Sequence, residues 1–160
     1  MRHITDTERR ARLARRHAVA PAHRVADPEA ATHAMTVLHA TEAPTVYLSL
    51  LARVDGITVA DVDRALYDDR TLVKQVAMRR TQFVFPRDLL PAAWASAAAR
   101  VAAGHGTRLA KEAVGAGLTD DGAAWLDQAR EATLTHLADL GGGAELTAGE
   151  LRAQVPALAG

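Results

Sequence analysis

The sequence predicts a mainly α-helical chain with one small β-hairpin, and three observations support this fold class. Apolar residues make up 49% of the 160 residues but aromatic residues only 4%, because alanine and leucine supply most of the apolar content. Such side chains favour closely packed helices over a β-sandwich. Helix-start signals occur in both halves of the chain, whereas residues 72–86 are rich in β-formers. The chain is long enough for one globular domain, or for one domain and part of a second.

Several protein classes are excluded by composition. The chain contains no cysteine, which excludes disulfides, thiolate zinc sites and cysteine nucleophiles. It has no run of 18 apolar residues, so the sequence predicts no membrane-spanning helix. The N-terminal arginines are not followed by an apolar stretch, which argues against a secretory signal. We therefore expect a cytoplasmic protein without membrane contact.

The formal net charge is zero, yet the charges are unevenly distributed. Residues 1–24 carry seven arginines and two acidic residues, and residues 70–111 carry eight basic residues and one acidic residue. Residues 25–69 and 112–160 each carry two arginines and eight acidic residues. The neutral total thus conceals two basic regions, a pattern that favours contact with DNA phosphates.

The N-terminal basic region predicts a helix from about Thr7 to His17, with Asp6 or Thr7 as its cap. Its arginines cover more than one face of this helix. Two interpretations stay open: a solvated helix surface, or an arm that contacts phosphates through guanidinium groups.

Two further helices follow in the first acidic region. The second begins at Asp27-Pro28-Glu29, since Asp can cap the free amides, Pro suits the first turn and Glu complements the helix dipole. We expect it to reach about His39. A third helix is predicted from about Thr45 to Val54, closed by Asp55-Gly56. Met35 and Leu38 are expected to face inward, and the third helix has its apolar positions at Val46, Leu48, Leu50 and Leu51.

A capping-box-like pattern, Thr58-x-x-Asp61, predicts a fourth helix that ends near Asp68. Two β-favouring runs, 72–78 and 81–86, come next and predict a short hairpin with Arg79-Arg80 near its tip. The tip lacks the Asn-Gly or Asp-Gly of a tight hairpin, so the sequence leaves the register open.

The rest of the chain is predicted to be helical. The expected helices span about 88–103, with Trp94 as packing anchor, then 107–114 after a break at residues 104–106, and 122–140. A full capping box, Thr147-x-x-Glu150, predicts a last helix toward Val155. Glycine-containing stretches at 115–117 and 141–143 are expected to separate these helices.

This order of elements is that of a winged helix-turn-helix followed by helices and an incomplete second helix-turn-helix. Residues 1–117 would form the first unit, with the fourth helix near the recognition position and the hairpin as the wing. Residues 118–160 would begin a second unit in a truncated chain, or form a tail that packs on the first. A helical domain with a purely structural hairpin remains the alternative.

Two stretches carry a family resemblance. Residues 37–54 read VLHATEAPTVYLSLLARV, and residues 76–86 read VAMRRTQFVFP. The first stretch resembles a signature segment of the AlkZ/YcaQ-type DNA glycosylases, which are tandem winged-helix proteins. The second stretch resembles the first wing of these proteins. The resemblance implies a longer natural chain and duplex DNA as the partner.

The resemblance also implies a reaction, hydrolysis of the N-glycosidic bond of N7-alkylated purines or the unhooking of crosslinks. Such a purine is cationic and leaves readily, so the enzyme chiefly stabilises an oxocarbenium-like sugar and directs a water molecule. The family's Gln-x-Gln or Gln-x-Asp motif falls on His39 and Thr41 in this chain. His39 could serve as a base, since a neutral imidazole is a competent proton acceptor. Alternatively, His39 is a helix-end residue and Thr41 a plain cap.

Other chemistries are disfavoured. The seven histidines are scattered without metal-ligand spacing, the glycine clusters lack the Lys-Ser/Thr of a phosphate loop, and neither serine sits in a nucleophile turn. We expect no metal and no cofactor, and nothing specifies the oligomeric state. Duplex DNA binding leads, with the glycosylase and a protein-interaction module as alternatives. The candidate DNA-binding residues are Arg79, Arg80, Lys74, Arg70, Arg9, Arg12, Arg16 and Tyr47.

Overall fold

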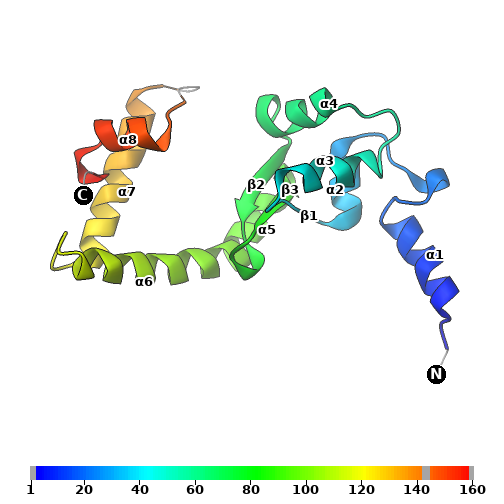
Figure 1. Ribbon diagram of the computed structural model, residues 1–160, viewed down its shortest axis with the longest axis horizontal. Coiled ribbons are helices and arrows are strands. Elements are labelled where there is room, and N and C mark those ends of the chain that lie inside the picture. Colours follow the sequence, from blue (N-terminus) through cyan, green and yellow to red (C-terminus); the bar gives the residue numbers. More distant parts are fainter. Residues whose placement is uncertain (1–2, 142–144, 159–160) are drawn as a thin grey trace. The chain divides into compact units, whose positions relative to one another are not determined.

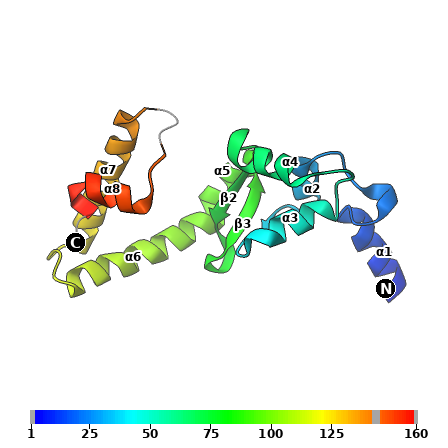
Figure 2. The same cartoon turned by 45° about the horizontal axis from the view of Figure 1, so that its top comes forward.

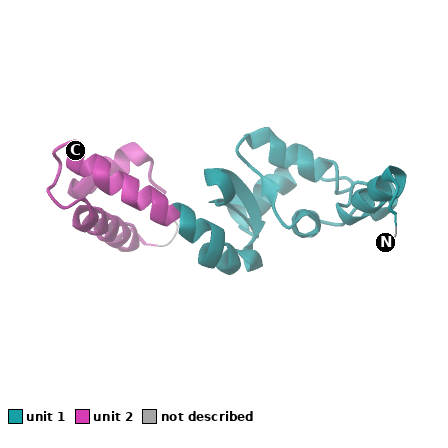
Figure 3. Cartoon of the chain, turned by 90° about the horizontal axis from the view of Figure 1, so that it is seen from below, with its two compact units in different colours: residues 1–101 teal, residues 102–160 magenta. Residues whose placement is uncertain are grey.

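The computed structural model describes residues 3–141 and 145–158. It is mainly helical with a small antiparallel sheet, as the composition predicts (Figure 1). The elements follow in this order: α1 (Asp6–Arg16), α2 (Pro28–Met35), β1 (Leu38–His39), α3 (Ala43–Leu51), α4 (Val59–Asp63), β2 (Leu72–Val76), β3 (Gln82–Pro86), α5 (Leu90–Ala93), α6 (Ala99–Gly115), α7 (Gly122–Asp139) and α8 (Ala148–Gln154). The chain divides into two compact units, residues 1–101 and 102–160 (Figure 3).

The predicted hairpin of β2 and β3 is present (Figure 2). It belongs to a three-stranded sheet of order β1-β3-β2. Val76 opposes Gln82 in the hairpin, which settles the register that the sequence left open. The prediction that the second helix reaches His39 is wrong. The helix α2 ends at Met35, where Thr36 adopts a left-handed backbone with φ of 71°, and Leu38-His39 then pair with β3. This turn allows Leu38 to enter the core beneath α3, because a continued helix would carry it away from the sheet.

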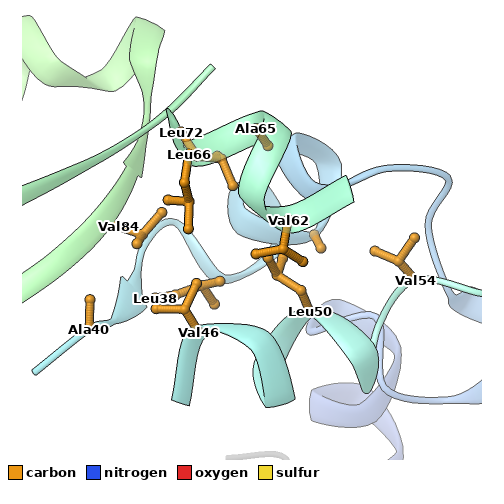
Figure 4. Packing of buried hydrophobic residues seen from close by; sticks show 11 residues of the cluster. Leu38, Ala40, Val46, Leu50, Val54, Val62, Ala65, Leu66, Leu72 and Val84 are labelled. Atoms are coloured by element: carbon orange, nitrogen blue, oxygen red, sulfur yellow. The ribbon is translucent and has the colours of Figure 1, made fainter. Parts of the chain in front are cut away.

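The sheet has an apolar cluster on each face. On one face Leu72 and Val84 pack with residues of α2, α3 and the α4 region, including the fully buried Leu50 and Val62 (Figure 4). On the other face Phe83 and Phe85 pack against α5. Successive residues of β3 therefore serve opposite cores, as the two-residue period of a strand requires.

Helix caps follow the sequence signals closely. Asp27 accepts from the Ala30 amide, and Thr58 and Thr147 each form a complete capping box. The predicted cap of α1 is wrong by one residue, since Thr5 accepts from the Glu8 amide. Beyond Asp63 the α4 helix continues as a wider, π-helical turn over residues 64–68.

The helix α3 begins earlier than predicted, because Pro44 fits within its first turn. Val46 and Leu50 are buried as expected. The other two apolar positions of this helix, Leu48 and Leu51, are 65% and 42% exposed. Gly56 has the positive φ expected of the turn that follows.

Two predictions for the second half of the chain are also wrong. The helix α6 runs through residues 104–106 without a break, since both glycines keep helical backbone there. Trp94 is 53% exposed instead of a packing anchor, and its indole N–H donates to Oε1 of Gln75 at 3.1 Å. The helices α7 and α8 match their predicted spans closely. Gly141 has a φ of 84°, and Gly142 and Gly143 lie outside the described residues.

Candidate nucleic-acid interface

The tip of the β2–β3 hairpin is formed by two arginines in an unusual conformation. The Thr81 amide donates to the Met78 carbonyl at 3.2 Å, so Arg79 and Arg80 are the central residues of the turn. Their φ angles are 55° and 62°. Positive φ at both central positions is the pattern of a type I′ turn, which Asn-Gly normally supplies.

Left-handed backbone costs a side-chain-bearing residue about 1–2 kcal/mol. The hairpin therefore carries arginine at two positions where folding alone would favour other residues. Both side chains are exposed, and within the described residues neither guanidinium group forms a hydrogen bond or ion pair; the Arg80 backbone amide donates to the Ala77 carbonyl at 3.2 Å. Two guanidinium groups at a narrow tip are suited to bidentate contact with phosphate oxygens.

Two other predicted cations gather around Tyr67. The Lys74 ammonium donates to the Tyr67 hydroxyl at 2.7 Å and lies 5.1 Å from the centre of its ring. Arg70 has a φ of 52°, and its Nε donates to the Tyr67 carbonyl at 3.3 Å. Tyr67 itself is 52% exposed and was not among the residues predicted to form the site. The sequence signal that could have identified Tyr67 as a site residue is its position at the end of the α4 region, three residues before Arg70.

Tyr47 is partly committed to the fold. Its hydroxyl donates to Oδ1 of Asp63 at 2.6 Å, across from α3 to α4. This hydrogen bond, followed by burial and the neighbouring Tyr67, raises the pKa of Tyr47 well above its usual range. Tyr47 is therefore a neutral donor at physiological pH, and its ring lines an exposed apolar hollow with Pro44 and Leu48.

His39 and Thr41 are brought together by β1 and the turn that follows it. Both are exposed, and His39 Nε2 lies 3.5 Å from Thr41 Oγ1. The imidazole stands edge-on to the Phe83 ring, with centroids 5.2 Å apart. His39 lies in a strand instead of at a helix end, and the helix cap position is taken by Glu42. An imidazole that packs against an aromatic ring and lies beside a hydroxyl group can accept a proton from a water molecule.

The N-terminal candidates lie on α1, which buries none of its residues. Arg9 and Arg16 are exposed, and Arg12 forms an exposed ion pair with Glu8 at 2.6 Å. An exposed pair of this kind contributes little to stability and exchanges readily for another anion. The helix thus presents several exposed positive charges to solvent.

Within residues 3–141 and 145–158, no cluster of three or more His, Asp or Glu side chains could hold a metal ion. None of the helices in that part of the chain is both long and apolar enough to cross a bilayer.

Comparison with known proteins identifies the family. No curated protein and no solved structure matches the sequence significantly. A family model described as DNA glycosylase AlkZ-like matches residues 32–159, which is most of the chain. The matched region contains both sequence stretches that carry the resemblance, as well as the hairpin and its arginines. The chain therefore belongs to the AlkZ-like DNA glycosylase family.

Proposed function

We propose that this chain binds duplex DNA through the β2–β3 hairpin, with Arg79 and Arg80 as the leading phosphate contacts. The observation that carries the proposal is the exposed arginine pair, which keeps two unfavourable backbone conformations at the tip. Membership of a DNA glycosylase family supplies the ligand class. Lys74 and Arg70 add charge along the same hairpin, and Arg9, Arg12 and Arg16 add it on α1. The Tyr47 hydroxyl is hydrogen-bonded to Asp63, so the ring is the part of this side chain that is available for a DNA contact.

The order of elements supports a winged-helix fold for this unit. The chain runs α2, β1, α3, α4, β2, β3, and the sheet order is β1-β3-β2. In this interpretation α3 and α4 form the helix-turn-helix and the hairpin is the wing. We further propose that residues 1–117 correspond to a winged-helix domain with trailing helices and that residues 118–160 begin a second one, although the compact units of the structure divide at residue 101.

Replacement of the tip arginines tests DNA binding directly. The Arg79→Gln/Arg80→Gln variant is expected to bind a random duplex at least tenfold more weakly near 50 mM salt. The slope of log K against log salt should become less negative by about 1.8, because each lost phosphate contact removes about 0.9. Fluorescence anisotropy over a salt series measures both quantities.

A matched control is Arg130→Gln in α7, whose guanidinium is exposed and pairs with Asp127 at 3.2 Å. This variant should bind like the parent chain. If the parent binds no duplex at low salt, or if both variants lose affinity equally, the proposed interface is wrong. The first outcome would leave the protein-interaction module as the remaining hypothesis.

A second candidate function is base excision, favoured by the contact between His39 and Thr41. In this hypothesis the imidazole accepts a proton from the attacking water and the hydroxyl orients that water. The leaving base would be an N7-alkylated purine, whose positive charge already weakens the glycosidic bond. The net step is hydrolysis: the C1′–N9 bond breaks, a C1′–O bond forms, and the proton from water passes to His39.

Base release tests this candidate. The parent chain should release 7-methylguanine from a duplex, and His39→Ala should lower the rate by about 100-fold, at the low end of what general base catalysis contributes. His39→Gln is the informative companion, since it restores a family-like side chain at this position. Equal release by parent and His39→Ala, with duplex binding intact in both, would remove His39 from the mechanism.

A further inference from the structure

The α4 helix stands where a winged-helix protein would place its base-reading element, yet its charge is wrong for that task. Residues 58–69, which contain α4 and its π-helical extension, carry four aspartates and one arginine. Residues 70–87, which contain the hairpin, carry five basic residues and no acidic residue. The two segments are consecutive in the chain and belong to the same compact unit.

Hydrogen bonds hold the negative charge of α4 in place. Asp61 accepts from both the hydroxyl and the amide of Thr58, and these bonds lower its pKa. Asp63 accepts from the Tyr47 hydroxyl at 2.6 Å. Asp68 and Asp69 are exposed at the end of the helix. Asp61 lies in the first turn of α4, where its carboxylate complements the positive end of the helix dipole.

One positive charge offsets the four carboxylates of this segment only in part. Arg64 is the basic residue of this segment, and its guanidinium lies 3.5 Å from Asp61. The segment also exposes Val59 and Ala60, which are uncharged, and Tyr67, whose ring is contacted by Lys74 from the hairpin. A helix that enters the major groove passes between two rows of phosphates, so its net charge of −3 opposes entry.

We infer that unit 1 docks on duplex DNA with the hairpin first and with α4 turned away from the phosphate backbone, so that it binds without reading base sequence. This inference rests on the DNA-binding function proposed above and goes beyond it by excluding the base-reading helix from the contact. The preferred ligand is then any duplex with an accessible phosphate backbone. Such a mode suits a protein that must engage DNA irrespective of the surrounding sequence.

The absence of cysteine from the chain provides a sharp test. A single cysteine can be introduced by Met78→Cys at the hairpin tip or by Ala60→Cys on the outer face of α4, and each is labelled with tethered iron–EDTA. Both positions are exposed, and neither carries charge in the parent chain. Anisotropy first establishes that each labelled chain retains parental affinity within about threefold. Strand cleavage then reports which element lies next to DNA.

The expected result is strong cleavage from the tether at residue 78 and at least tenfold weaker cleavage from residue 60. A panel of unrelated duplexes of equal length should bind with affinities within about threefold of one another. Equal or stronger cleavage from residue 60, or a marked preference for one duplex, would overturn the orientation while leaving DNA binding intact. Undetectable binding by the parent chain would overturn the DNA-binding proposal and this inference together.

Discussion

Gly122→Ala is expected to unfold the second compact unit, residues 102–160. Gly122 is the first residue of α7 and is buried where α7 begins beside α6. A Cβ atom at this position would overlap the backbone carbonyl of Ala110, which belongs to α6. Neither side of this contact is a flexible side chain, so the two helices would have to separate.

The expected loss is large for a unit of this size. Overpacking of a tight contact costs about 3 kcal/mol at the upper end of its usual range. Units below about 70 residues seldom have more than 3–5 kcal/mol of stability in total. The described part of this unit buries only small residues, namely Ala113, Gly122, Ala129 and Val155. Its free energy of unfolding therefore falls close to zero.

Gly104→Ala is the matched control. Gly104 lies within α6, and nothing approaches within 4 Å of the position of its added Cβ. Alanine is favoured over glycine inside a helix by about 0.5–1 kcal/mol, so this substitution should stabilise the unit.

Urea unfolding followed by Trp125 fluorescence in a Trp94→Phe background reports on α7 selectively. Opposite shifts of the midpoint are expected for the two alanine variants. A Gly122→Ala midpoint equal to that of the parent would show that the α6–α7 contact is looser than described here.

The sequence predicts local structure well where side chains act on their own backbone. The caps at Asp27, Thr58 and Thr147 and the hairpin at residues 72–86 were all found this way, because capping and strand alternation are local interactions. The sequence predicted a break in α6 at residues 104–106, because the local effect of two glycines was given more weight than the rest of the helix. Two glycines weaken a helix by an amount that the remaining residues of the helix can offset.

Features that depend on contacts between residues far apart in the chain could not be predicted from the sequence. The strand β1 exists only because Leu38 and His39 find partners in β3, more than forty residues later. No local signal gives that pairing, since residues 27–39 also carry a good helix start. The contact between His39 and Thr41 follows from the same strand. The conformation of Arg79 and Arg80 was hidden too, because arginine is not a residue that indicates a type I′ turn.

Replacement of the tip by Arg79→Asn/Arg80→Gly is expected to make the first unit more stable and its DNA binding weaker. Asn-Gly is the preferred pair for two consecutive left-handed residues, so the change relieves the strain at both positions. The expected gain is about 1–2 kcal/mol in the free energy of unfolding, less than the full cost of two strained arginines because asparagine retains part of it. The same change removes both guanidinium groups, so affinity for a random duplex should fall at least tenfold.

The Arg79→Ala/Arg80→Ala variant separates the two effects. Alanine removes the charges but keeps a Cβ in the left-handed region, so affinity should fall as far while stability stays near that of the parent. Urea unfolding of each variant and anisotropy with a fluorescent duplex give the two quantities. A fall in both stability and affinity for the Asn-Gly tip would mean that the arginines support the hairpin structurally. A rise in stability with a loss of binding would instead identify Arg79 and Arg80 as residues retained for their charge at the expense of the fold, as expected of a surface whose task is to hold DNA.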